Sequence, residues 1–220
     1  MKDRNDIPYS QEVLRKCIHL CSLSIPIVGS ILERKTMLEI LVPITLFTII
    51  LDLLSHKIES VRNFVSKFFG KMLRKHENGK EILLNGASWV FLSAVLCISI
   101  FPKIIFITAF TILIISDISA ALYGRKFGTR KFLDKSFEGS SAFFISSIIV
   151  ILVIGTLSGA PITYYAFGIL GGFVAAIVEA ASKRLRVDDN LSIPLSVGAI
   201  MIIGSMISDA IGNSFINILR

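Results

Sequence analysis

The sequence has 220 residues, of which 53% are hydrophobic, with a mean hydropathy of +0.74 and a formal net charge of +7. One buried core of a soluble domain does not need so large an apolar fraction, so the excess apolar surface must face lipid. This composition excludes a soluble enzyme or a soluble binding domain. The three cysteines lie in apolar stretches without metal-ligand spacing, which argues against a disulfide framework or a zinc site.

Seven apolar stretches approach the roughly 20 residues that a membrane-spanning helix needs. They are 17–32, 37–54, 83–101, 104–123, 141–159, 162–182 and 191–216. The sequence therefore predicts an all-α integral membrane protein with about seven transmembrane helices, built as a single domain over 1–220. In the last stretch Gly204, Asp209 and Gly212 interrupt the apolar pattern and can end the span early.

The distribution of Lys and Arg predicts the orientation in the membrane. The N-terminal segment and the loops 55–82, 124–140 and 183–190 lie on one side of a seven-span arrangement and hold 19 of the 23 basic residues. By the positive-inside rule this side is cytoplasmic, so we expect the N-terminus inside and the C-terminus outside. Because the net charge has this topological origin, we expect no nucleic-acid partner.

The loop after the second span has an amphipathic pattern. Apolar residues recur at helical spacing from Ile58 to Met72, and six Lys or Arg residues lie among and beside them between Lys57 and Lys75. This pattern predicts an interfacial helix over about 57–77, lying in the cytoplasmic headgroup layer with its cations towards lipid phosphates. A soluble amphipathic helix packed on the other cytoplasmic loops is the alternative.

Three of the acidic residues inside the predicted spans lie at matching depths. Asp52, Asp117 and Glu179 each lie within roughly two turns of the cytoplasmic end of the second, fourth or sixth span. A carboxylate in a helix centre costs about 2.5–3.5 kcal/mol on insertion scales, so three at one depth predict a shared polar pocket. The alternative is that each is hydrated at the interface or pairs with a loop cation, and this alternative is strongest for Asp52.

A basic loop with glycines, GRKFGTRKFLDKSFEGSS, connects the fourth and fifth spans next to these acids. Gly139 lets the backbone approach a ligand closely, and free N–H groups at a helix start bind anions. Phosphate is therefore the expected ligand. Carboxylates beside it would hold Mg²⁺ or another divalent cation between phosphate oxygens.

Several sequence blocks together resemble a known enzyme family. In chain order they are QEVLRKCIHL, LDLLS, LRKHENGKEILLNGAS, SDISAALYGRKFG, KSFEGSSAFF and VEAASKRLRVDDNLSIPL. They resemble the successive motifs of the dolichol kinase, phytol kinase and CTP-dependent diacylglycerol kinase family, whose relatives include phosphatidate cytidylyltransferase. The resemblance extends over nearly the whole chain. Two positions depart from it: Ser55 and His56 stand where an arginine often follows Asp-Leu-Leu, and Asn85 stands where threonine is common.

The resemblance implies a CTP site with Mg²⁺ and assigns residues to it. The expected catalytic residues are Asp117, Glu138, Glu179 and His19. The expected nucleotide-binding residues are Arg15, Lys16, Gly124, Arg125, Gly128, Lys135, Gly139, Ser140 and Asn190. The expected metal ligands are Asp117 and Asp189.

The expected function is phosphoryl transfer from CTP to the hydroxyl of a lipid alcohol at the cytoplasmic membrane face. The acceptor class includes polyprenol or dolichol, a phytol-type isoprenoid and diacylglycerol, and the sequence gives no sign of an oligomeric state. One alternative is cytidylyl transfer from CTP to a lipid, as in phosphatidate cytidylyltransferase. Another is a small ion-coupled transporter whose intramembrane acids form an ion path, although the position of the acids at one edge argues against it.

Overall fold

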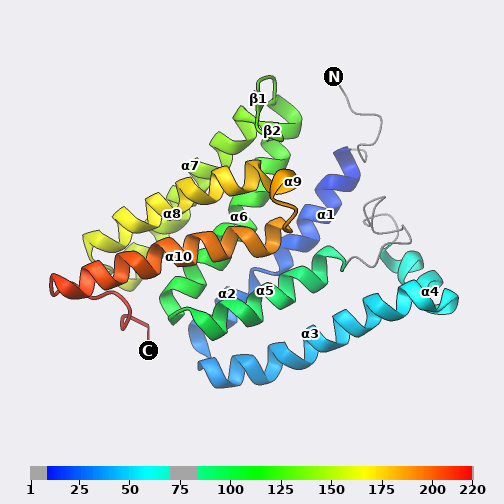
Figure 1. The fold of residues 1–220 in the computed structure, drawn as a ribbon, viewed down its shortest axis with the longest axis horizontal. Helices are drawn as coiled ribbons and strands as arrows, with labels where there is room; N and C mark the ends of the chain where they lie inside the picture. The colour runs from blue at the N-terminus through cyan, green and yellow to red at the C-terminus, as the bar shows by residue number, and fades with distance from the viewer. Residues whose placement is uncertain (1–8, 70–83, 220) are drawn as a thin grey trace.

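The computed structural model describes residues 9–69 and 84–219, which are mostly helical (Figure 1). The helices are α1 Tyr9–Cys21, α2 Ser24–Ile31, α3 Arg34–Lys57, α4 Glu59–Phe69, α5 Gly86–Ile100, α6 Lys103–Phe127, α7 Phe137–Ser158, α8 Ile162–Ala180, α9 Ser182–Leu185 and α10 Asp189–Ala210. Two short strands, β1 Lys131–Phe132 and β2 Lys135–Ser136, form a hairpin between α6 and α7.

Among the described residues, six helical segments are long and apolar enough to cross a membrane. They are Tyr9–Ile31, where α1 continues into α2, and helices α3, α6, α7, α8 and α10. These segments confirm the prediction of a helical, multi-pass membrane protein. The predicted span 83–101 corresponds to α5, which is apolar but has 15 residues. A total of seven crossings therefore stays a prediction.

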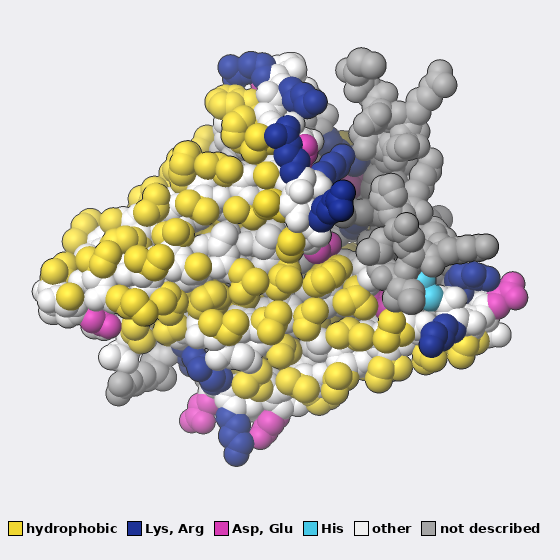
Figure 2. Space-filling model, in the orientation of Figure 1, with side chains coloured by type: hydrophobic (Ala, Val, Ile, Leu, Met, Phe, Trp, Pro, Cys, Tyr) yellow, Lys and Arg dark blue, Asp and Glu magenta, His cyan; other side chains and the backbone are white. Residues whose placement is uncertain are grey.

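Helix α6 forms the centre of the bundle. Most of its side chains between 104 and 114 are fully buried, as expected for a helix that is apolar on all sides. It packs against α1, α2, α5, α7 and α10, and α8 packs against α7 and α10 (Figure 1). The outer helix faces expose large apolar side chains, while Lys and Arg gather around the hairpin and α9 (Figure 2). The bundle therefore has an apolar belt and a basic end.

Helices α3 and α5 form a pair that is joined at both ends. At one end the Arg34 guanidinium donates to the carbonyl oxygen of Phe101, at 2.7 Å. At the other end the Asp52 carboxylate accepts hydrogen bonds from the backbone N–H of Asn85, at 3.0 Å, and from the Ser88 hydroxyl, at 2.6 Å. Helix α5 therefore runs antiparallel to α3 along the stretch from Asp52 back to Arg34.

Two helix boundaries and one loop differ from the sequence prediction. Helix α10 ends at Ala210, so the predicted span 191–216 was too long; a turn follows in which Gly212 has a positive φ of 75°. The amphipathic helix is α4, Glu59–Phe69, and residues 70–77 of its predicted range lie outside the described residues. The loop before α7 contains a hairpin that the sequence pattern did not predict.

Candidate functional site

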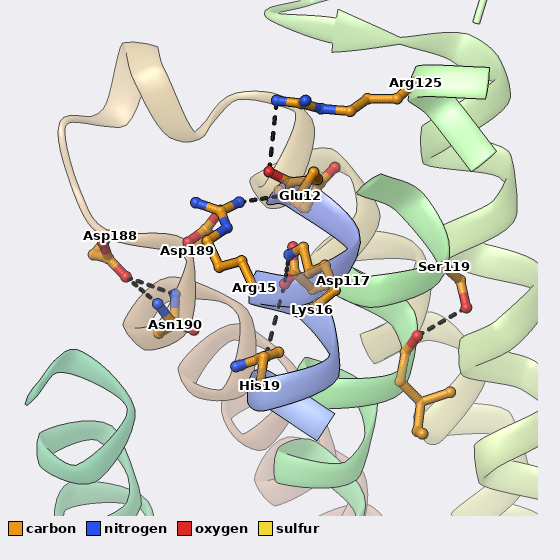
Figure 3. A network of polar contacts seen from close by, with 12 residues as sticks. Glu12, Arg15, Lys16, His19, Asp117, Ser119, Arg125, Asp188, Asp189 and Asn190 are labelled. Carbon is orange, nitrogen blue, oxygen red and sulfur yellow. Dashed lines mark hydrogen bonds and ion pairs between the residues drawn. The ribbon is translucent and has the colours of Figure 1, made fainter. Parts of the chain in front are cut away.

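Charged residues from five separate segments meet at the basic end of the bundle. Figure 3 shows the residues that come from α1, α6 and the start of α10. The segments are α1, the last turns of α6, the β1–β2 hairpin, the end of α8 and the start of α10. Four of the residues are almost fully buried: Glu12 and Glu179 are 1% exposed, Asp117 is 5% exposed and Lys16 is 6% exposed. Burying a charged group costs free energy unless the group is paired, so the ion pairs among these residues determine the stability of this end of the bundle.

Helix α1 presents its charged residues on the side that faces α6. Glu12, Lys16 and His19 are three or four positions apart, which places them on one helix face, and α1 packs against α6. Lys16 donates a hydrogen bond to the Asp117 carboxylate, and His19 Nε2 lies 3.7 Å from the same carboxylate oxygen. Asp117 is thus held by two basic groups from α1 (Figure 3).

Glu12 connects the beginning of α1 to the end of α6. Its carboxylate accepts a hydrogen bond from Arg15 at 2.7 Å, and its second oxygen lies 3.6 Å from the guanidinium of Arg125. The sequence assigned Arg15 and Arg125 to phosphate binding without pairing them through this acid. Their side chains keep 24% and 28% exposure, so both remain accessible to a ligand from the aqueous side.

Lys135 forms the second half of the cluster. Its ammonium donates to Glu179 at the end of α8 and lies 3.7 Å from Asp189 at the start of α10. Burial alone would lower the pKa of Lys135, but the carboxylates of Glu179, Asp189 and Asp117 raise it above its ordinary value. Lys135 is therefore a cation at neutral pH, close to both carboxylates predicted to bind metal.

Three buried polar atoms of the charged cluster have no hydrogen-bond partner among the described residues. They are Oε2 of Glu12, Nε2 of His19 and Oε2 of Glu179. Buried polar atoms in folded proteins normally have partners, and exceptions often occur at functional sites. The unpaired oxygen of Glu179 therefore marks this end of the bundle as a place where a ligand, an ion or water completes the bonding.

The predicted metal ligands are held by lysines in this structure. Asp117 pairs with Lys16, and Asp189 lies beside Lys135. Within residues 9–69 and 84–219 no group of three or more His, Cys, Asp or Glu side chains forms a ready-made metal site. The donor chemistry nevertheless fits a hard divalent cation, because Asp117, Glu179 and Asp189 supply carboxylate oxygens and one of those oxygens is unpaired.

The glycines of the basic loop have a packing role. A Cβ atom on Gly124 would lie 2.9 Å from the Ser136 hydroxyl and 3.1 Å from the Cα of Gly139, and one on Gly128 would lie 2.2 Å from the Gly124 carbonyl oxygen. These glycines let the end of α6, the hairpin and the start of α7 approach one another. Contact with a ligand is thus not needed to explain why glycine stands at Gly124, Gly128 and Gly139.

Three other predicted site residues lie apart from the ion pairs of the cluster. Glu138 accepts hydrogen bonds from Thr129 and Arg130, so it orders the loop before the hairpin. Asn190 donates from its backbone and its side chain to Asp188, the residue before α10. Ser140 is 7% exposed, and its hydroxyl has no partner among the described residues.

Asp52 has a local structural role. Both its carboxylate oxygens accept hydrogen bonds from Asn85, and Oδ2 also accepts one from Ser88; Asn85 in turn caps the start of α5. The expected shared polar region therefore contains Asp117 and Glu179, whose charges both act on Lys135, while Asp52 stabilises the α3–α5 pair. Asn85, which departs from the motif that the sequence resembles, makes two of the contacts with Asp52.

Comparison with known proteins places the chain beside one relative over most of its length. It is 37% identical over 185 residues to Uncharacterized protein RP860 of Rickettsia prowazekii, covering 84% of this chain and 90% of that protein. It is 34% identical over 71 residues to Uncharacterized protein MJ1137 of Methanocaldococcus jannaschii, covering 32% of each. No family model and no solved structure matches the chain. By its extended similarity, the chain belongs to the same family as Uncharacterized protein RP860.

Proposed function

We propose that the chain is a CTP-dependent kinase that phosphorylates the hydroxyl of a lipid alcohol at the cytoplasmic face of a membrane. One observation carries the proposal. The charged residues of separate motif-like blocks, in α1, α6, the hairpin, α8 and α10, converge in one cluster at the basic end of an apolar bundle. The cations at this end can bind phosphates, and the adjacent apolar belt can accommodate the tail of a lipid.

The basic residues of the cluster would bind the phosphates. Phosphoryl transfer depends mainly on in-line positioning and on neutralising the charge of the transferred group. The side chains of Arg15, Arg125 and Lys135 keep 24%, 28% and 30% exposure, whereas Lys16 is buried against Asp117. The three partly exposed cations would therefore meet the nucleotide first, and Lys16 would complete the clamp around the reacting phosphate.

Glu179 fits the role of the base better than Glu138. The Oε2 atom of Glu179 is buried without a hydrogen-bond partner among the described residues, whereas the oxygens of Glu138 are occupied by Thr129 and Arg130. A base must reach the hydroxyl proton directly or through one water. His19, next to Asp117, would then adjust the charge around that acid rather than accept the proton.

Asp117 and Asp189 would hold Mg²⁺ when CTP is bound. Mg²⁺ usually takes one or two protein carboxylates together with substrate phosphates, and it supplies charge neutralisation during transfer. Lys16 and Lys135 now neutralise the acids. For the two aspartates to become available, the lysine ammonium groups would move from the carboxylates to the arriving phosphates.

Seven crossings with the N-terminus inside are part of the proposal. The α3–α5 pair supports it, because the hydrogen bonds at Asp52 and Arg34 hold both ends of α5 against the long apolar helix α3. The 15 residues of α5 rise roughly 22 Å, and with the extended residues at its two ends the segment approaches the hydrocarbon thickness of about 30 Å. With α5 as a crossing, the basic segments all fall on one side, which the positive-inside rule assigns to the cytoplasm.

Cysteine accessibility tests this orientation. In a background with Cys17, Cys21 and Cys97 replaced by alanine, we expect Lys35→Cys to react with an impermeant maleimide on intact cells. Lys131→Cys should react only after permeabilisation. Both lysines are exposed, so the two cysteine variants make the same chemical change. They differ only in which end of the bundle carries the label. The opposite pattern would put the cluster outside and remove CTP as its donor.

A product assay tests the activity. Purified protein with CTP labelled in the γ-phosphate or in the base, Mg²⁺ and a panel of lipid alcohols should release CDP and form a lipid monophosphate. Cytidylyl transfer, the closest rival, uses phosphatidate, releases pyrophosphate and gives a CDP-lipid. If neither product forms with any lipid while Na⁺ or H⁺ flux appears in proteoliposomes, the transporter alternative replaces the proposal.

A further inference from the structure

The hairpin that carries Lys135 is too small to hold its own shape. Its strands pair Lys131 with Ser136 and Phe132 with Lys135, two residues on each side. An isolated hairpin is marginal in water even when it is longer. At its turn Leu133 adopts a left-handed conformation with φ of 52°, which is unfavourable for a branched apolar residue. Contacts outside the hairpin must therefore hold it in place.

Asp134 supplies those contacts at the corner between α8 and α9. Its backbone N–H donates to the Ala180 carbonyl at 3.0 Å. Its carboxylate accepts from the backbone N–H of Arg184 at 3.1 Å and from the Arg184 Nε at 3.0 Å. The Asp134 side chain is 16% exposed and the Arg184 side chain is 59% exposed, so the acid is shielded from water while the guanidinium lies at the surface.

These bonds affect the charged cluster because Asp134 and Ala180 are each next to a cluster residue in the sequence. Lys135 directly follows Asp134, and Glu179 directly precedes Ala180. Because Asp134 is hydrogen-bonded to Ala180, Lys135 of the hairpin lies beside Glu179 of α8. This is where Lys135 donates to Glu179 and lies 3.7 Å from Asp189.

We propose that Asp134 and Arg184 form a latch that positions Lys135 within the charged cluster and thereby sets how well the cluster binds CTP phosphates. The second half of this inference rests on the proposed kinase function; the first half does not. Neither latch residue touches the reacting groups, so both are positioning residues. The latch also ties the α6–α7 connection to the α8–α10 connection across the basic end.

Amine labelling of Lys135 tests the latch without any assay of activity. In Asp134→Ala the hairpin loses both side-chain contacts, and Lys135 should react with an amine-specific reagent about two- to tenfold faster, read by mass spectrometry. Arg184→Gln keeps the backbone N–H bond to Asp134, so its effect should be smaller. The double variant should equal Asp134→Ala, because both changes break one interaction. Lys183→Gln removes the same charge from the same short helix and should change nothing.

Kinetics then test the consequence for the nucleotide. With Asp134→Ala, the apparent affinity for CTP should weaken by a factor similar to the labelling change, while the KM for the lipid alcohol stays constant. Arg184→Lys, which can still reach Asp134, should restore most of the CTP affinity that Arg184→Gln loses. Unchanged labelling of Lys135 in Asp134→Ala would overturn the latch. Faster labelling in a protein that phosphorylates no lipid would support the latch and reject the kinase.

Discussion

Replacing Asp117 by asparagine is expected to lower lipid phosphorylation by roughly a hundredfold or more. The change keeps the side-chain shape but removes the charge that would hold Mg²⁺ and that now holds Lys16 and His19. Steady-state turnover with CTP and the preferred lipid alcohol measures the loss. Near-normal turnover would show that Asp117 has no part in the chemistry.

Stability must be separated from chemistry in this experiment. Asp117→Asn leaves the buried Lys16 ammonium without its counter-charge, and breaking a buried pair from one side costs about 3–5 kcal/mol. The double variant Lys16→Met with Asp117→Leu removes both charges and should recover most of the thermal stability. It should stay inactive. Asp209→Asn, the same chemical change at an exposed acid near the end of α10, should alter neither property.

The helices could be predicted because lipid imposes a simple rule on them. A backbone in hydrocarbon must satisfy its own hydrogen bonds, so each long apolar stretch has to be a helix. The rule does not determine where each helix begins and ends, because polar contacts set those positions. Asn85 has an extended backbone and binds Asp52, so α5 begins at Gly86 and is shorter than the apolar stretch. Hydropathy carries no information on such a long-range bond.

Several members of the charged cluster could be predicted, but neither its full composition nor its pairings. Matching depths of Asp117 and Glu179 correctly indicated that they share a polar region. Which cation faces which acid depends on helix rotation and packing, and Lys16 pairs with Asp117 across 101 positions of sequence. Asp52 lies at the same depth on its helix but binds the start of α5 instead. A carboxylate at the end of a span can either join a charged cluster or hold a neighbouring helix.

The glycine loop shows how one pattern allows two interpretations. Glycines at Gly124 and Gly128 suit either a phosphate loop or close approach of helices through small residues spaced by four. In the structure they pack against Ser136 and Gly139. The spacing of four at the end of an apolar helix was a signal for packing. The hairpin escaped prediction because strands of two residues have no periodicity and its left-handed turn position is Leu133, not glycine.

Lys135→Gln is expected to weaken CTP handling by roughly 10- to 150-fold, the worth of one charge-assisted hydrogen bond of about 1.5–3 kcal/mol. Because nearby carboxylates raise the pKa of Lys135, its charge persists above the pH at which an ordinary lysine loses its proton. Lys135→Arg, which keeps the charge, should therefore retain more CTP affinity than Lys135→Gln at every pH tested. The KM for the lipid alcohol should hardly move.

Lys131→Gln is the matched control for this prediction, since it makes the same change on the other strand of the same hairpin at an exposed position. Lys135→Gln also leaves Glu179 buried without its partner, so some loss of stability is expected; adding Glu179→Gln should relieve that loss without restoring turnover. Apparent CTP affinity and lipid KM, measured together for the set, decide the assignment. If Lys135→Gln changed only the dependence on lipid, the hairpin would face the lipid headgroup, and the nucleotide would have to bind elsewhere at the basic end.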